Sequence, residues 1–140
     1  MYNTKMMIIM RRDLKMRKGK IAAQAGHAAV EATIRALKKE ERLNDIVTDG
    51  DELFLNTEGT HSSPLCEWMN GGCAKICVYV DSQEELDAIA VKAEKMGIIS
   101  VIITDAGATE FHGVKTKTCL ALEPLPSDIA DSITGALPLY

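Results

Sequence analysis

Residues 5–29 read KMMIIMRRDLKMRKGKIAAQAGHAA and hold an apolar run, a basic connection and the start of a patterned apolar stretch. The run at residues 5–10 is short and ends in charge, which is typical of a buried strand. From residue 21 onward, apolar side chains fall on both sides of a helical wheel, so we expect a largely buried helix. A strand followed by a helix indicates the first unit of an α/β fold.

Three further apolar runs predict the rest of the sheet. Residues 75–80 (KICVYV) and 98–103 are rich in β-branched side chains, and residues 118–122 follow a turn at His112 and Gly113. With the first run, they give four expected strands. At 140 residues, with 46% hydrophobic and 26% charged residues, the chain has the length and composition of one domain covering residues 1–140.

Helix signals lie between and after these strands. Ser82 and Glu85 form a capping box, and Gly97 supplies a stop after the apolar positions that follow at helical spacing. Ser127 is expected to cap a last short helix that ends at Gly135. Strands that alternate with helices predict an α/β sheet with helices on both faces.

The segment at about residues 44–64 has no sustained period. Its sequence, NDIVTDGDELFLNTEGTHSSP, is rich in acids, glycines and hydroxyl side chains, with one brief apolar run at residues 53–55. Loops of this length inside a compact domain are uncommon and tend to be functional or mobile. We expect a surface excursion, such as a small hairpin or lid, rather than a domain boundary.

Charge is strongly segregated along the chain. Residues 5–20 hold seven basic side chains and one acidic, a local charge of +6; because the whole chain carries −4 and residues 1–4 are uncharged, residues 21–140 carry −10. Such segregation can turn a positive face toward a polyanion. A solvated basic loop is the alternative interpretation.

Apolar segments and cysteines indicate a cytoplasmic protein. No apolar run reaches the length of about 18 residues that a membrane span needs, so no membrane association is expected. The four cysteines are then expected to be reduced thiols. His61, Cys66, Cys73 and Cys77 lack the repeated close spacing of a structural zinc site, so no metal is expected.

Two stretches are candidates for a functional site. Lys20, Gln24, His27 and Glu31 fall within about 60° of one another on the helical wheel and form a polar seam. The seam is either a hydrogen-bonded internal network or the floor of a cleft. Because Lys20, Gln24 and His27 lie in one line along the helix, a cleft is favoured. Residues 104–109, TDAGAT, follow a predicted strand, and Asp105 lies where open α/β sheets bind ligands, although an aspartate that caps a turn is the plain alternative.

Five stretches together resemble the archaeal and eukaryotic type (class II) peptidyl-tRNA hydrolase family. They are residues 5–29, AKICVYVDSQEEL (74–86), TDAGATE (104–110), KTCLALEP (117–124) and ITGALPLY (133–140). The resemblance covers nearly the whole chain except residues 44–64, which look like an insertion. It implies a four-stranded mixed sheet sandwiched by helices on both faces, a homodimer, and hydrolysis of the ester that joins a peptide to tRNA, without a cofactor, in translation and ribosome rescue.

The resemblance also assigns site residues by position. The catalytic residues would be Lys20, His27, Asp105 and Thr109. Thr116 or Thr118 would stand for the family's threonine near the last strand. By their charge, and not by the resemblance, Lys15, Arg17, Lys18 and Lys115 are expected to hold the tRNA backbone. Gln24 of the polar seam, Thr116 and Thr118 complete the expected substrate-binding set. The chain departs from the family at Ala108, where an arginine is usual, at Arg17, where a glycine is usual, and in the turn at residues 112–116, which is one residue longer.

Ester hydrolysis needs a positioned water, a group that accepts its proton and a donor for the oxyanion, and requires neither a metal nor a covalent nucleophile. In this scheme Lys20 stabilises the developing negative charge, and Thr109 orients a partner by a hydrogen bond. Either Asp105 or His27 accepts the proton; a buried lysine would keep Asp105 charged, and His27, with a reference pKa near 6.5, is the better-matched base.

Two other classes of function stay open at this stage. One is a non-catalytic RNA-binding relative, for which Ala108 and the altered turn are the signals. The other is a protein-interaction module in which residues 44–64, close to Trp68, make the contact. A serine or cysteine hydrolase is disfavoured, because the chain has no G-x-S-x-G motif and Cys119 lies in a predicted strand.

Overall fold

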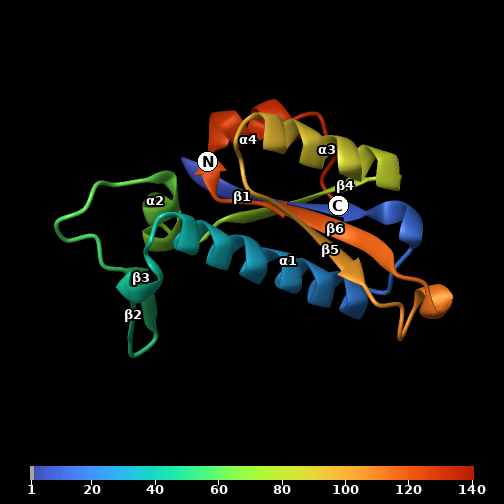
Figure 1. The fold of residues 1–140 in the computed structure, drawn as a ribbon, viewed down its shortest axis with the longest axis horizontal. Helices are drawn as coiled ribbons and strands as arrows, with labels where there is room; N and C mark the ends of the chain where they lie inside the picture. The colour runs from blue at the N-terminus through green and yellow to red at the C-terminus, as the bar shows by residue number, and fades with distance from the viewer. Residues whose placement is uncertain (1) are drawn as a thin grey trace.

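In the computed structural model, which describes residues 2–140, the strand β1 (Thr4–Arg11) lies at the centre of a mixed sheet (Figure 1). The strand order is β4-β1-β6-β5, with β4 (Lys75–Val80) parallel to β1. The strand β6 (Thr116–Leu122) is antiparallel to β1, and β5 (Ser100–Asp105) is antiparallel to β6. The short β7 (Leu125–Pro126) pairs with the start of β1.

The predicted α/β class is confirmed, but the predicted count of four strands is wrong. Each of the four expected strands forms, and its ends lie within two residues of the expected ones. The sheet has a fifth strand in β7, and β2 (Ile46–Asp49) and β3 (Glu52–Leu55) form a separate two-stranded sheet. A two-residue strand is too short to leave an alternating pattern in the sequence.

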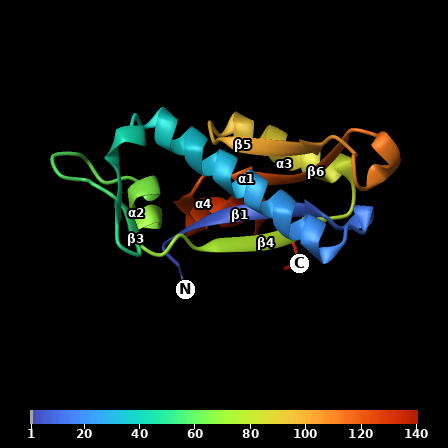
Figure 2. The ribbon, with the colours of Figure 1, turned by 90° about the horizontal axis from the view of Figure 1, so that it is seen from below.

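The helices lie on both sides of the main sheet (Figures 1 and 2). The long α1 (Lys18–Lys39) crosses one face, and α3 (Gln83–Lys95) and α4 (Ser127–Thr134) cover the other. An unpredicted helix, α2 (Pro64–Asn70), lies with the β2–β3 hairpin at one end of the molecule, so the layout departs from the simple sandwich that was expected. Single 3₁₀ turns occur at η1 (Arg12–Leu14), η2 (Leu43–Asp45) and η3 (Phe111–Gly113).

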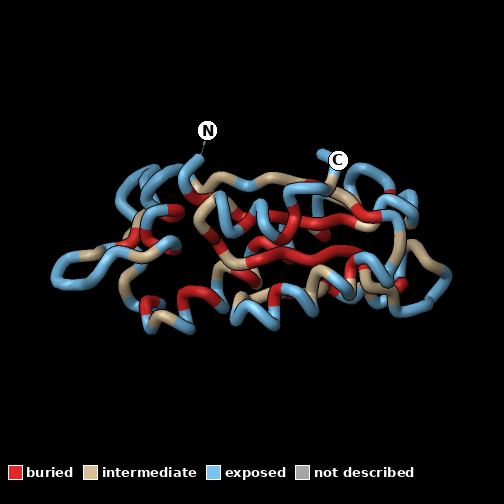
Figure 3. Tube along the Cα trace, turned by 90° about the horizontal axis from the view of Figure 1, so that it is seen from above, coloured by how far each residue is buried: buried red, intermediate tan, exposed pale blue. Residues whose placement is uncertain are grey.

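The strand β1 is buried on both of its faces. Met6, Ile8 and Met10 belong to the core beneath α1, whereas Met7 and Ile9 belong to the core beneath α3 and α4. Figure 3 shows that burial is concentrated along the strands of the sheet. A strand covered on both faces needs a continuous apolar run instead of an alternating one, which explains why residues 6–10 are all apolar.

One predicted helix cap is confirmed and the other is wrong. The hydroxyl of Ser82 accepts a hydrogen bond from the backbone N–H of Glu85 at 3.1 Å, as expected, and the Glu85 carboxylate accepts from the N–H of Asp81. Ser127 does not cap α4: it is the first helical residue, and its hydroxyl donates to the backbone oxygen of Tyr2. That bond ties the start of α4 to the start of the chain.

The expectation that α1 is largely buried is also wrong. Ala28, Ala32 and Ala36 face the sheet and are at most 2% exposed, but Val30 is 59% exposed and Ile34 is 49% exposed. The alanines allow the helix to approach the strands closely, and nothing in the described part of the chain covers the opposite side of the helix. The wheel pattern showed apolar side chains on two flanks but did not show that only one flank has a partner.

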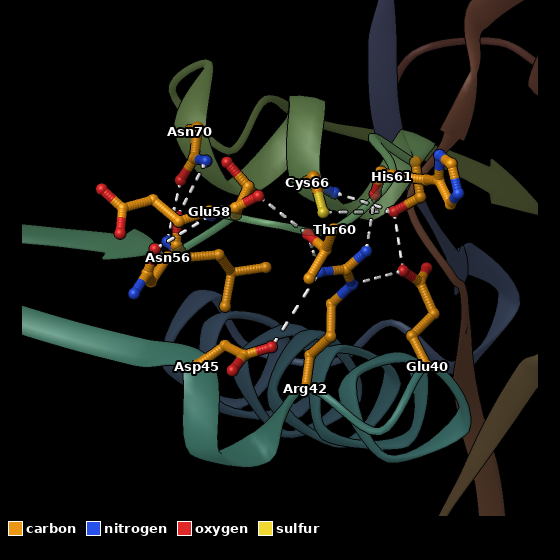
Figure 4. Close-up of polar contacts among 12 residues, drawn as sticks. Glu40, Arg42, Asp45, Asn56, Glu58, Thr60, His61, Cys66 and Asn70 are labelled. Carbon is orange, nitrogen blue, oxygen red and sulfur yellow. Dashed lines mark hydrogen bonds and ion pairs between the residues drawn. The ribbon is translucent and has the colours of Figure 1, made fainter.

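The segment at residues 44–64 forms the expected hairpin, followed by a loop that leads into α2. The loop is tied down by Arg42, which is only 8% exposed (Figure 4). Its guanidinium donates to the Glu40 carboxylate at 2.8 Å, to the Thr60 hydroxyl at 3.1 Å and to the backbone oxygen of His61 at 2.8 Å. Arg42 therefore joins the end of α1 to the far end of the loop.

We expect Arg42→Lys to loosen this loop selectively. Lysine keeps the charge but lacks the planar fork that reaches three partners at once, so the free energy of local opening should fall by about 1.5–3 kcal/mol. Hydrogen exchange at Thr60 and His61 should quicken by about tenfold or more, while exchange in β1 stays unchanged. Arg35→Lys, on the exposed side of α1, is the matched control, and equal exchange in both variants would contradict the anchoring role.

Candidate active site

An ion pair between Lys20 and Asp105 joins α1 to the sheet. The Lys20 ammonium donates to Asp105 Oδ1 at 2.6 Å, and the two side chains are only 15% and 13% exposed. Lys20 lies in the first turn of α1, and Asp105 is the last residue of β5. The start of the helix and the end of the strand meet at the same end of the molecule (Figure 1).

The turn after β5 fixes the second oxygen of this carboxylate. Asp105 Oδ2 accepts the backbone N–H of Gly107 at 2.8 Å. Gly107 has φ of +81°, and a Cβ atom there would lie 2.5 Å from the backbone oxygen of Val114, so only glycine fits. Sequence reasoning had passed over this residue, although a glycine two positions after a site aspartate is a turn signal.

The hydrogen bond from Lys20 lowers the pKa of Asp105 below its ordinary value, and the Gly107 N–H acts in the same direction. Partial burial of the carboxyl opposes this effect but is the smaller influence. Asp105 is therefore a carboxylate at neutral pH, held between an ammonium group and a backbone amide.

Thr109 completes the cluster. Its hydroxyl accepts a second hydrogen bond from the Lys20 ammonium, at 3.3 Å. An ammonium group has three N–H donors, so one donor of Lys20 is left for a ligand. Lys20, Asp105 and Thr109, which the resemblance placed in one catalytic set, thus form one hydrogen-bonded cluster.

Gln24 lies one turn beyond Lys20 on α1 and contacts Thr118 of β6, and both side chains are buried. The Thr118 hydroxyl donates to Gln24 Oε1 at 2.6 Å; Gln24 is 8% exposed and Thr118 is fully buried. At these two positions the structure has an internal network linking α1 to β6, in place of the cleft floor that was expected.

The structure does not bring His27 into hydrogen-bond contact with the Lys20–Asp105 pair. The His27 side chain is 61% exposed, and its Nε2 lies 4.0 Å from Glu31 Oε2. Seven residues of α-helix separate Lys20 from His27, which corresponds to about 10 Å along the axis. His27 lies on the same side of α1 but belongs to a different part of the surface.

Two basic side chains and one acidic side chain, Glu110, line a hollow beside the cluster. Lys15 and Arg17 line it together with the turn at residues 107–113, and its volume is about 360 Å³. Ala108 lines the same hollow, so Arg17 and Ala108, the two single positions at which the chain departs from the expected pattern, face one space. Lys18 and Lys115 are exposed nearby in sequence, and the Thr116 hydroxyl donates to the backbone oxygen of Val114 at 2.9 Å.

No group of three His, Cys, Asp or Glu side chains within residues 2–140 is arranged to hold a metal ion. Cys66 and Cys119 are buried, and burial raises the pKa of Cys119 to about 11, so this thiol is protonated at neutral pH. In the same range, no helix is long and apolar enough to cross a membrane.

Comparison with known proteins gives a consistent result. Residues 4–140 match the family model described as Peptidyl-tRNA hydrolase PTH2. The chain is 37% identical over 139 residues to a peptidyl-tRNA hydrolase of Thermococcus sibiricus, with 99% of each chain covered. It is 40% identical over 136 residues to a peptidyl-tRNA hydrolase of Saccharolobus solfataricus, covering 96% of this chain and 98% of the relative.

Two further similarities are more limited, one in the share of the relative that is covered and the other in sequence identity. The chain is 41% identical over 137 residues to a Drosophila melanogaster protein named "Probable peptidyl-tRNA hydrolase 2", covering 98% of this chain but only 62% of that relative's length. A solved structure of a protein of unknown function from Agrobacterium tumefaciens superimposes with a TM-score of 0.51 at 15% identity, over 100% of this chain and 99% of the other. At that identity the likeness concerns the fold alone.

We expect Lys20→Met to raise the pKa of Asp105, because the substitution removes the hydrogen bond that lowers it most. Carboxyl-carbon NMR titration of labelled protein measures this directly. Lys5→Met is the matched control, because Lys5 makes an equally short pair with Asp131 at 2.6 Å and is also 15% exposed. An Asp105 titration that is the same in all three proteins would contradict the pairing.

Proposed function

Because the chain belongs to the Peptidyl-tRNA hydrolase PTH2 family, we propose that it hydrolyses the ester bond between peptide and tRNA at the Lys20–Asp105 pair. The reaction is a carboxylic ester hydrolysis that releases the peptide and frees the tRNA. The observation that carries this assignment is the 2.6 Å contact between the Lys20 ammonium and Asp105 Oδ1, beside a cationic hollow.

Lys20 is the electrophilic group. Asp105 and Thr109 take two of its three N–H donors and so hold the ammonium in place, while the third donor is available to the ester carbonyl oxygen. As water attacks the carbonyl carbon, negative charge develops on that oxygen. A positioned ammonium in a partly buried site stabilises this charge more than bulk water does.

Asp105 orients the attacking water and accepts its proton. A carboxylate oxygen has more than one lone pair, so both oxygens of Asp105 keep acceptor capacity beside their bonds to Lys20 and Gly107. The lowered pKa makes Asp105 a weak base, and the ester of an amino acid is an activated one. His27 lies about 10 Å along the helix from Lys20, which favours Asp105 as the proton acceptor.

The exposed side chains of Lys15, Arg17 and Lys18 hold the phosphates of the tRNA. Lys15 and Arg17 line the hollow next to Thr109, and Lys18 follows them at the start of α1, where a polyanion attached to the ester would emerge. Charge contacts of this kind release counterions, so affinity falls as salt concentration rises.

The alternatives that the sequence left open receive less support. The residues needed for turnover are assembled, which disfavours a non-catalytic RNA-binding relative. Trp68, which had drawn attention to the neighbouring insertion, is 3% exposed and donates through Nε1 to the backbone oxygen of Ala74 at 2.8 Å, so it belongs to the core. The homodimer, the cytoplasmic location, the role in ribosome rescue and the status of residues 44–64 as an insertion stay predictions.

The variants Lys20→Ala and Asp105→Asn test the proposed catalytic role of this ion pair directly. Loss of a preorganised donor to the oxyanion should lower kcat on peptidyl-tRNA by about 10²–10³-fold, and loss of the carboxylate that holds this donor should have a similar effect. The matched controls are Lys5→Ala and Asp131→Asn, which break an ion pair of the same 2.6 Å length elsewhere on the molecule. Near wild-type turnover in either active-site variant would overturn the assignment.

The pH dependence of kcat/KM distinguishes the two candidate bases. The Asp105 pKa is lowered, so with Asp105 as acceptor the rate should stay level from pH 8 down to about pH 5, above the ordinary range of an aspartate. With His27 as acceptor, the rate would fall below about pH 6.5, and His27→Gln would abolish that fall together with most of the activity. We expect a level profile that His27→Gln leaves in place.

The shared hollow of Arg17 and Ala108 leads to a rescue experiment. Arg17→Ala should raise KM and reduce the slope of log affinity against log salt by about one, as for one lost phosphate contact. Adding Ala108→Arg should restore both quantities, because it returns a guanidinium to the same space. Lys95→Ala, at the exposed end of α3, is the control; failure of the double variant to recover would show that the two positions are not equivalent.

A further inference from the structure

The surface of α1 changes character beyond the cationic hollow. A groove of about 850 Å³ lies along the helix. It is lined from the sheet side by Ile99 and from α1 by His27, Val30, Glu31, Ile34, Arg35, Lys38 and Lys39. We call it the α1–β5 groove, because Ile99 immediately precedes β5. The groove therefore begins on the side of His27 and leads away from the basic residues at the helix start.

Exposed aliphatic side chains distinguish this groove from the phosphate-binding side. Val30 is 59% exposed and Ile34 is 49% exposed, although both are β-branched apolar residues on a helix. The Arg35 guanidinium is bound by the Glu31 carboxylate at 2.9 Å, and the Lys39 ammonium lies 3.6 Å from Glu123. Two of the three basic side chains that line the groove are thus paired, and the third, Lys38, lies at its far end. Between His27 and Ile34 the groove presents exposed aliphatic side chains, which suit the apolar side chains of a peptide.

The strand β5 runs from the groove, which Ile99 lines, to the Lys20–Asp105 pair at its other end. It is the edge strand of the sheet, and among the described residues it pairs only with β6 (Figure 2). Its last residue, Asp105, is bonded to Lys20, and the residue before its start, Ile99, lines the groove with Ile34. An extended peptide beside such an edge finds free backbone donors and acceptors.

We propose that the peptide part of peptidyl-tRNA lies in the α1–β5 groove, running from the ester at Lys20 and Asp105 toward Ile99. This inference rests on the proposed function, which places the ester at that pair. The tRNA leaves the ester on the cationic side, so the peptide leaves it on the opposite side, with its amino end toward Ile99. In this direction the peptide runs parallel to β5.

The dimensions identify which peptide residues the groove receives. From Lys20, His27 lies about 10 Å along the helix axis and Ile34 about 21 Å, at 1.5 Å per residue. An extended peptide advances about 3.3 Å per residue, so the third to sixth residues from the ester lie beside His27, Val30 and Ile34. A single amino acid on tRNA does not reach the groove, and the groove therefore favours peptidyl-tRNA over aminoacyl-tRNA.

The test compares two substrates on the same tRNA: an N-acetyl-aminoacyl ester and an ester of six apolar residues. Val30→Asp and Ile34→Asp each place a charge against the longer peptide, so the ratio of KM for the long to the short substrate should rise about fivefold over wild type. Val91→Asp is the matched control, since Val91 is 49% exposed on α3, across the sheet, and its ratio should not change. Melting temperatures of the three variants establish that all are folded.

The outcomes separate this inference from the proposed function. Wild-type protein that fails to hydrolyse the short substrate would overturn the proposed function. If the protein hydrolyses the short substrate but neither groove variant changes the KM ratio, the proposal that the peptide lies in the groove is overturned and the proposed function stands. The same conclusion follows if Val91→Asp changes the ratio equally.

A second measurement does not depend on the groove variants. A photoreactive residue placed fifth from the ester, in a complex with Asp105→Asn protein, should crosslink to residues 27–38 of α1. Crosslinks to α3 or to the β2–β3 hairpin instead would also overturn the inference.

Discussion

The contact between Lys20 and Asp105 is the interaction on which the site depends. It joins residues 85 positions apart in the chain, one at the start of α1 and one at the end of β5. Each charge is mostly removed from water, which is costly for either alone and tolerable for the pair. The pair also fixes the state of each partner, because it keeps Asp105 ionised and holds the Lys20 ammonium against Thr109.

The packing of α1 makes this contact possible. Three alanines at helical spacing face the sheet and let the helix lie close to the strands. The Gln24–Thr118 hydrogen bond, buried one turn beyond Lys20, sets the rotation and the axial position of the helix on β6. A bulkier contact face would lift the helix and separate the ammonium from the carboxylate, so core packing and the geometry of the site are linked.

One helix also separates the two halves of the proposed substrate. Cationic side chains gather at its start, beside the hollow next to Thr109, and exposed aliphatic side chains follow after His27. The ester lies between these two surfaces in the proposed arrangement. The β2–β3 hairpin stands at the far end of the helix, where Arg42 anchors its loop, and it is outside the reacting centre.

The sequence by itself determined the local structure: the four main strands, the capping box at Ser82, the basic segment, and Lys20 and Asp105 as candidates. These follow from periodicity, turn residues and charge, which act between near neighbours. Only the tertiary structure decided that Gln24 is buried, that His27 faces another groove, and that Val30 and Ile34 stay exposed. A helical period shows which residues share a face, but the partner that covers that face is set by long-range packing.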